Sequence, residues 1–143
     1  MKVKIKRIDE TLPLPARKTK GAVAFDFCAR EGVQISSGEI GYVPLNVIIK
    51  VPEGHGLFVF ARSGTHKKGL VLANGVGIID SDFCGEEDEI KAVYLNVSKS
   101  EVVIEKGERI AQGVIWKTEN VDWEEVNEMN SVSRGAFGTT GEK

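Results

Sequence analysis

The chain has 143 residues, of which 41% are hydrophobic and 28% are charged, and its formal net charge is -2. This length fits one domain with a single hydrophobic core. The near balance of charge excludes the strong positive field that non-specific binding to nucleic acid or to anionic membranes requires, so an anionic ligand must be held by a local site. We therefore expect neither nucleic acid nor a membrane among the partners.

The amino-terminal residues MKVKIKRIDE alternate charged residues with Val3 and Ile5, which is unlike a signal peptide. No apolar run approaches the roughly 20 residues that span a bilayer. Cys28 and Cys84 suit a reducing compartment, and their spacing does not resemble that of zinc ligands. These features lead us to expect a cytoplasmic protein.

The dominant hydrophobic period along the chain is two, which indicates β-strands. The first strand covers residues 43–51, where apolar side chains occupy the odd positions. A second strand is predicted at GLFVFA, residues 56–61, and a short helical turn at THKK, residues 65–68. The strands that follow are IKAVYLNV at 90–97, EVVIE at 101–105 and RIAQGVIW at 109–116. Turns rich in glycine and proline separate these strands, so we predict an all-β sandwich or barrel.

The alternation stops after Trp116, and the segment that follows is polar and ends in a glycine-rich stretch. We therefore divide the chain into a β-barrel domain at 1–117 and a C-terminal arm at 118–143. Two interpretations of the arm are open. It is a frayed terminus, or it folds over a phosphate ligand, with Arg134, Phe137 and backbone N–H groups in contact with that ligand.

The stretch GIIDSDFCGEEDEI, residues 77–90, concentrates acidic side chains directly after an apolar run. An EF-hand calcium loop needs oxygen ligands at positions 1, 3, 5 and 12 with glycine at position 6. Asp80, Asp82 and Gly85 fit positions 1, 3 and 6, but position 5 is Cys84 and position 12 is Lys91, so this interpretation fails. Two hypotheses remain for the stretch: a solvated hairpin, or a place where Asp80 accepts a proton from an attacking water.

Three further loops carry candidate residues. Asp26 interrupts the apolar run AFDFCA and is either a structural hydrogen-bond acceptor or part of a site. The end of a predicted strand, before the short helical turn, carries Arg62, Ser63 and Gly64. These residues either bind phosphate or cap the helical turn. Gln112, in KGERIAQGVIW, either contacts a ligand or satisfies backbone groups.

In this order, the clusters resemble the five short motifs of the trimeric deoxyuridine triphosphate nucleotidohydrolases, the dUTPases. The matching segments are AFDFCA at 24–29, ARSGTHKKG at 61–69, NGVGIIDSDFCGE at 74–86, GERIAQGVI at 107–115 and RGAFGTTG at 134–141. Each motif is modest alone, whereas their combination in this order is specific.

The resemblance implies a jelly-roll-like β-barrel with one short helix and a flexible C-terminal arm, assembled as a homotrimer. Active sites would lie between subunits, and the arm of one chain would close over a site elsewhere in the trimer. The implied reaction is hydrolysis of dUTP to dUMP and pyrophosphate, which limits uracil incorporation into DNA and supplies dUMP for thymidylate synthesis. The implied cofactor is Mg²⁺, held by the triphosphate and by no direct protein ligand, with Asp26 near it through water.

The resemblance also assigns roles by position. Asp80 would activate the attacking water, and Asp26 and Asp82 would support the site. The residues implied to contact substrate lie in four of the motifs and at the start of the next strand. For the phosphates they are Arg62, Ser63, Gly64 and Gln112; for the base and sugar, Asn74, Gly77, Ile78, Ile79, Phe83 and Lys91; and from the arm, Arg134, Phe137, Gly138 and Thr139.

Three departures from the family pattern bear on selectivity. Phe83 stands where the family usually has tyrosine, Glu87 to Glu89 form an insertion, and Arg134 precedes Phe137 by three residues in place of five. Two alternative functions remain. One is a deoxycytidine triphosphate deaminase of the same fold, which usually reads RSS where this chain has RSG, and the other is a nucleotide-binding module without turnover.

Overall fold

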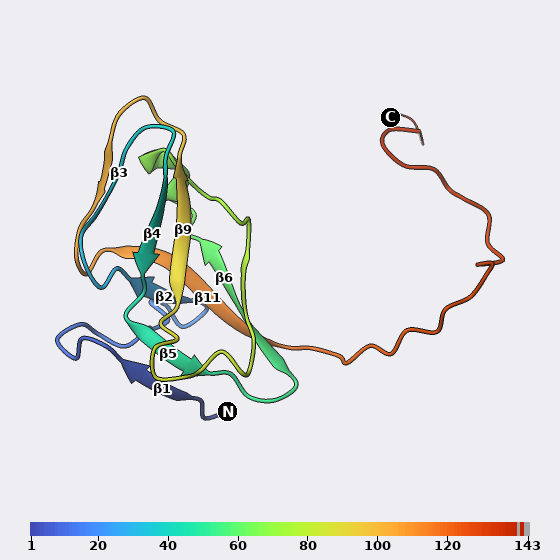
Figure 1. Ribbon diagram of the computed structural model, residues 1–143, viewed down its shortest axis with the longest axis horizontal. Helices are drawn as coiled ribbons and strands as arrows, with labels where there is room; N and C mark the ends of the chain where they lie inside the picture. Colours follow the sequence, from blue (N-terminus) through green and yellow to red (C-terminus); the bar gives the residue numbers. More distant parts are fainter. Residues whose placement is uncertain (140, 142–143) are drawn as a thin grey trace.

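The computed structural model describes residues 1–139 and 141, and regular structure in this part of the chain is almost entirely β-strand (Figure 1). Among these described residues, the one short helix is the 3-10 turn η1 at Thr65–Lys68. In chain order, the strands are β1 Lys4–Arg7, β2 Phe25–Cys28, β3 Val33–Ile35, β4 Ile40–Pro44, β5 Val47–Lys50, β6 His55–Ala61, β7 Leu70–Leu72, β8 Gly77–Ile79, β9 Lys91–Asn96, β10 Val102–Ile104 and β11 Arg109–Lys117.

The strands form four small antiparallel sheets that wrap around one core. The largest has the order β2-β11-β6-β8, and a three-stranded sheet has the order β4-β9-β7. β1 pairs with β5, and β3 pairs with β10. Inward side chains of all four sheets bury one hydrophobic cluster, whose largest members are Tyr94, Phe27, Ile35, Leu45, Leu57, Leu70, Ile90, Ile104 and Ile110.

The order of the largest sheet determines where the loops meet. β11 lies between β2 and β6, with Gln112 opposite both Asp26 and Phe60. The start of β11 therefore lies beside the end of β6 and the end of β2. These three chain segments carry the motifs that contain Arg109, Arg62 and Asp26, respectively.

Several predicted elements are confirmed. η1 covers the predicted residues 65–68, and β6, β9, β10 and β11 each agree with their predicted ranges to within one residue at either end. β11 ends at Lys117, and the described residues after it hold no helix or strand and lead away from the barrel (Figure 1). Thr140, in the segment RGAFGTTG, lies outside the described residues. Within the described residues, no helix is long and apolar enough to cross a membrane.

The prediction of one continuous strand over residues 43–51 is wrong. β4 ends at Pro44 and β5 begins at Val47, because Asn46 adopts a left-handed conformation with φ of 69°. Asn46 is 1% exposed, and its side chain accepts a hydrogen bond from the Asp9 N–H at 2.7 Å and donates one to the Asp9 carbonyl at 3.0 Å. Asparagine tolerates this conformation better than most residues, and here its amide ties the chain after β1 to the break between β4 and β5.

We predict that Asn46→Ala lowers the free energy of unfolding by about 2–3 kcal/mol, because it removes two buried hydrogen bonds and strains the left-handed backbone. Asn46→Gly is the matched control, since glycine adopts positive φ freely and loses only the hydrogen bonds. Urea unfolding followed by tryptophan fluorescence measures both variants. If Asn46→Ala is as stable as the wild type, this role of the side chain is wrong.

Candidate functional site

A carboxylate between two arginines is the centre of the candidate site. Asp26, on β2, accepts a hydrogen bond from Arg62 Nε at 3.1 Å and another from Arg109 Nη1 at 2.9 Å. Arg62 Nη1 also donates to the Arg109 carbonyl at 3.1 Å. Since only 14% of the Asp26 side chain is exposed, the carboxylate is screened from water and holds both guanidinium groups in place.

The two arginines open onto a cavity of about 360 Å³. Its lining is Arg62, Gly64, Thr65, Lys68, Glu108, Arg109 and Ile110. Lys68 forms an ion pair with Glu108. Partial burial raises the pKa of Glu108. The Lys68 ammonium and a hydrogen bond from the Glu105 N–H together lower this pKa by a larger amount, so the net shift is downward. The three cations of the cavity thus outnumber its one carboxylate, which suits an anionic ligand.

The loop after β6 brings Ser63 and Gly64 to the mouth of this cavity. Both are exposed, and Gly64 directly precedes η1, which has no side-chain cap. The Ser63 side chain therefore does not cap η1, and the interpretation of this loop as a helix cap is not confirmed. Thr65 closes the loop from inside, because its Oγ1 accepts the Arg62 backbone N–H at 3.0 Å.

Gln112 serves the backbone in this structure. Its Nε2 donates to the Ala61 carbonyl at 2.9 Å, which ties β11 to the residue before Arg62. Gln112 also lines a second hollow of about 460 Å³, next to Asp26 and Phe60. The sequence left open whether Gln112 contacts a ligand or satisfies backbone groups. In this structure it satisfies a backbone carbonyl, and its side chain lies next to the arginine network.

Asp80 lies at the opposite end of the sheet from the two arginines. β8 pairs with β6 through Ile79 and Leu57, so Asp80 follows beyond that pair, whereas Arg62 is five residues further along β6. At about 3.3 Å per residue, roughly 17 Å of strand separates Leu57 from Arg62, and Asp80 lies one residue further away. One chain therefore does not bring the predicted catalytic aspartate to the predicted phosphate grip.

Most of the predicted base-binding residues lie on β8 or in the segments next to it in the chain. Asn74 begins the turn before this strand, where the Val76 N–H donates to the Asn74 carbonyl at 2.8 Å. Gly77 packs so closely on β6 that a Cβ there would lie 3.2 Å from the Val59 Cβ. Ile78 is 63% exposed and Phe83 is 40% exposed. Lys91 is exposed at the start of β9, opposite Pro44.

The loop from Asp80 to Ile90 is anchored, which corrects one expectation. Glu89 accepts hydrogen bonds from Arg30 Nε at 2.8 Å and Nη2 at 3.1 Å, and a third from the Asn46 N–H at 3.0 Å. Asp88 accepts from the Gly85 N–H at 2.7 Å. The hypothesis of a solvated hairpin in the stretch 77–90 is wrong for Glu89, although Glu87 is exposed.

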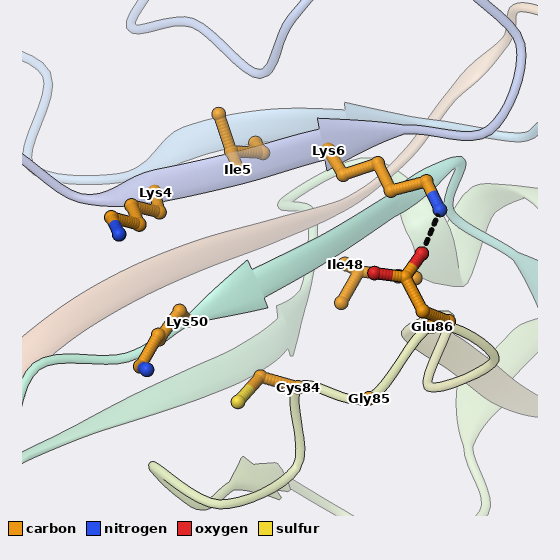
Figure 2. Close-up of a pocket in the computed structure, with 8 residues that line it drawn as sticks. All are labelled: Lys4, Ile5, Lys6, Ile48, Lys50, Cys84, Gly85 and Glu86. Carbon is orange, nitrogen blue, oxygen red and sulfur yellow. Dashed lines mark hydrogen bonds and ion pairs between the residues drawn. The ribbon is translucent and has the colours of Figure 1, made fainter.

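The same loop also contacts the first strand pair. Figure 2 shows a hollow of about 210 Å³ between the loop and strands β1 and β5, in which Lys6 reaches Glu86. The Lys6 ammonium lowers the pKa of Glu86. Cys84 and Gly85 form the floor of this hollow opposite Lys4 and Lys50 (Figure 2). These contacts hold the loop that carries Asp80, Asp82 and Phe83 against the barrel.

The arm residues lie apart from the site within one chain. Arg134, Phe137, Gly138 and Thr139 are all exposed. The sequence alone did not point to the cavity residues Glu108, Thr65 and Lys68. It also missed Tyr94, a buried phenol whose hydroxyl reaches the start of β11. A tyrosine at an inward position of an apolar strand was the available signal for Tyr94, because a buried phenol needs a hydrogen-bond partner.

A metal ion must be considered beside this anion site. Within residues 1–139 and 141, no group of three or more histidine, cysteine, aspartate or glutamate side chains is gathered as a ligand set. Asp26 is the carboxylate behind the two arginines, and both its oxygens accept hydrogen bonds from arginine. Such a site fits Mg²⁺ that is held by ligand phosphates and water rather than by a protein cage.

Comparisons with known proteins agree with this geometry. The model of the dUTPase family matches residues 10–141. The deoxyuridine 5'-triphosphate nucleotidohydrolase of Hydrogenobaculum sp. (strain Y04AAS1) is 41% identical over 147 residues, which cover 100% of both chains. The crystal structure of the Streptococcus mutans dUTPase is 38% identical with a TM-score of 0.77, covering 83% of this chain and 98% of that one.

A more distant structure supports the fold alone. A Staphylococcus bacteriophage 80alpha dUTPase mutant with dUpNHpp has a TM-score of 0.86 at 24% identity, over 98% of each chain. Together with the strand arrangement, these similarities confirm the expected all-β, jelly-roll-like fold.

We predict that Asp26→Asn lowers stability by about 1–2 kcal/mol at low salt, because two guanidinium groups then face each other without a carboxylate. Added salt screens that repulsion, so the deficit shrinks as ionic strength rises. Thermal melting at two salt concentrations measures this, with Glu39→Gln, at an exposed carboxylate, as the control. An Asp26→Asn deficit that does not change with salt would contradict the electrostatic explanation.

Proposed function

Because this chain belongs to the dUTPase family, we propose that it hydrolyses dUTP to dUMP and pyrophosphate. The observation that carries the proposal is the pair of guanidinium groups held by Asp26 at a cation-rich cavity, beside the exposed loop Ser63–Gly64. In a cell, this activity limits uracil incorporation into DNA and supplies dUMP for thymidylate synthesis.

The proposed mechanism assigns charge neutralisation and water activation to different segments. Phosphoryl transfer needs positioning and electrostatic stabilisation more than covalent help. Arg62 and the backbone N–H groups of Ser63 and Gly64 bind the phosphate chain, and Gln112 lies next to them. The Asp80 carboxylate accepts a proton from the attacking water and aligns it with the α phosphorus. Asp82, in the same loop, is proposed to support the site.

Mg²⁺ is the proposed cofactor. When bound with the triphosphate, it would supply positive charge to the oxygens on which negative charge develops. Asp26 would help to hold it through water, in keeping with an acid whose oxygens already hold two arginines.

Uracil and deoxyribose are proposed to bind at the edge of the largest sheet. β8 is the last strand in the order β2-β11-β6-β8, so one row of its backbone N–H and C=O groups faces away from β6. The edge at Gly77, Ile78 and Ile79 offers donors and acceptors for the base, next to Asn74. The Phe83 ring packs on the sugar and excludes a 2′-hydroxyl, and Lys91 lies at the far side of this pocket.

We propose that the complete site requires more than one chain, in a homotrimer. The separation of Asp80 from Arg62 along β6 supports sharing of the site between copies. An aromatic patch on the outer face of the same sheet supports association. Trp116 is 47% exposed, and its ring lies 5.1 Å from the Phe58 ring and 5.7 Å from the Phe60 ring, between centroids. Exposed apolar patches beside a site commonly mark subunit interfaces.

The C-terminal arm, residues 118–143, is proposed to close over a site elsewhere in the trimer. Phe137, whose side chain is fully exposed, would stack on the base, and a base stacked on an aromatic ring gains about 1–3 kcal/mol. Arg134 and the backbone at Gly138 and Thr139 would approach the phosphates. A closed arm excludes bulk water from the reaction.

The activity is tested directly with purified protein and Mg²⁺ in separate incubations with dUTP, dCTP, dTTP and UTP. We expect pyrophosphate from dUTP alone. Ammonia from dCTP with a retained triphosphate would instead identify a deaminase, and binding without any product would identify a nucleotide-binding module. Release from UTP as well would show that Phe83 does not exclude ribose.

We predict that Asp80→Asn abolishes turnover while the affinity for dUTP stays within about tenfold, because the change removes the proton acceptor and leaves the phosphate grip intact. Steady-state kinetics and calorimetric titration measure the two effects. Glu87→Gln removes one negative charge from the same loop and serves as the control. Retained turnover in Asp80→Asn would refute the assignment.

Deletion of residues from Ser131 onward is predicted to reduce turnover far more than stability. The described residues of this segment are exposed and lie outside the strands, so the core keeps its packing. Turnover and the thermal midpoint are compared with those of the full chain. A large drop in the thermal midpoint would mean that the arm is part of the folded domain.

A further inference from the structure

Tyr94 links the two main sheets through its hydroxyl. It lies on β9, in the three-stranded sheet, and its side chain is completely buried. Its Oη donates a hydrogen bond to the Ile110 carbonyl at 2.6 Å, on β11 of the four-stranded sheet. A phenol in the core is costly unless its hydroxyl is paired, so this contact is specific to one position on β11.

Ile110 is the additional residue of a β-bulge. In the pairing of β11 with β2, Arg109 is opposite Cys28 and Ala111 is opposite Phe27, so two steps on β11 match one step on β2. A bulge disrupts the hydrogen-bond ladder locally and redirects the neighbouring side chains. Here the redirected neighbour is Arg109, whose Nη1 reaches Asp26 and whose carbonyl accepts from Arg62. Tyr94 therefore holds the Ile110 carbonyl at the bulge, and this bulge sets the direction of the preceding Arg109 side chain.

Thr65 connects the same phenol to the other arginine. The Thr65 side chain is buried, and its Oγ1 accepts the Arg62 backbone N–H at 3.0 Å. Burial raises the pKa of Tyr94, while the neighbouring Arg62 and Thr65 side chains act in the opposite direction. Tyr94 thus stays protonated as a donor, and its hydroxyl lies among the backbone groups that position both arginines.

We propose that Tyr94, together with Thr65, is a positioning residue that sets the geometry of the Arg62–Asp26–Arg109 network for the phosphate chain. This inference rests on the proposed function only in taking the network as the phosphate grip. Tyr94 touches no substrate. It acts through Ile110 at the bulge and through Thr65 in the loop after β6, so its loss misaligns the phosphate contacts and leaves the edge of β8 unchanged.

The test compares two ligands that differ in their phosphate chain, dUpNHpp and dUMP, by calorimetric titration of the full-length protein with Mg²⁺. Tyr94→Phe keeps the ring and removes the hydroxyl. We expect this variant to bind dUpNHpp about tenfold more weakly than the wild type, with a far smaller loss of affinity for dUMP. The reason is that the Ile110 carbonyl loses its partner, which shifts the arginine side of the site. Tyr42→Phe is the matched control, since Tyr42 is the other tyrosine, is 64% exposed, and lies on neighbouring β4.

Two variants at Thr65 keep the test decisive if Tyr94→Phe does not fold. Thr65→Val removes the acceptor of the Arg62 N–H at nearly constant volume and is expected to reproduce the selective loss for dUpNHpp. Thr65→Ser retains the hydroxyl and is expected to recover most of that affinity. Equal losses for the two ligands, or no loss for either, would overturn the positioning role.

The proposed function and this inference fail in different ways. A wild-type protein that binds dUpNHpp but does not hydrolyse dUTP overturns the proposed function and leaves the comparison of variants intact. A wild-type protein that does not bind dUpNHpp overturns the grip and this inference with it.

Discussion

The carboxylate of Asp26 is the interaction on which the arrangement of the site depends. Arg62 and Arg109 repel each other unless an anion lies between them, and Asp26 supplies that anion within 3.1 Å of one and 2.9 Å of the other. The three residues come from separate strands or strand ends, and the order β2-β11-β6 is what brings them together. The sheet therefore holds two guanidinium groups ready for an anionic ligand before that ligand arrives, which limits the ordering cost of binding.

The same sheet separates the phosphate grip from the proposed water activator. β8 runs antiparallel to β6, so the chain that leaves β8 at Asp80 moves away from Arg62. Ion pairs from Arg30 to Glu89 and from Lys6 to Glu86 hold the loop after Asp80 against the barrel. Since this loop is anchored, reaching Arg62 by a large movement within one chain would break these contacts. The proposed association of copies would join the two halves of the site without that cost.

Much of the fold followed from local patterns, and the rest depended on tertiary contacts. β6, β9 and β11 alternate clearly, and Gly69, at φ of 77°, ends η1. The strand at residues 43–51 was wrong, because the apolar alternation continues through Asn46 while the backbone turns there. β1, β2, β3, β7 and β8 were not predicted, since strands of three or four residues acquire their geometry mainly from their partners. The order of the motifs indicated the site residues. Strand register sets the separation of Asp80 from Arg62, and tertiary packing sets the partners of Glu89 and Tyr94, so neither could be inferred from a short stretch of sequence.

The most direct test of a site shared between copies is complementation. Asp80→Asn and Arg62→Ala chains, each expected to be inactive alone, are unfolded, mixed in equal amounts and refolded together. The rate of dUTP hydrolysis is then measured, and native mass spectrometry checks that mixed oligomers have formed. A shared site predicts recovery to about one quarter of wild-type activity, because each site then combines an intact Asp80 and an intact Arg62 in one case of four under random assembly. If mixed oligomers form and no activity returns, Asp80 and Arg62 act from the same chain and the account of a shared site is wrong.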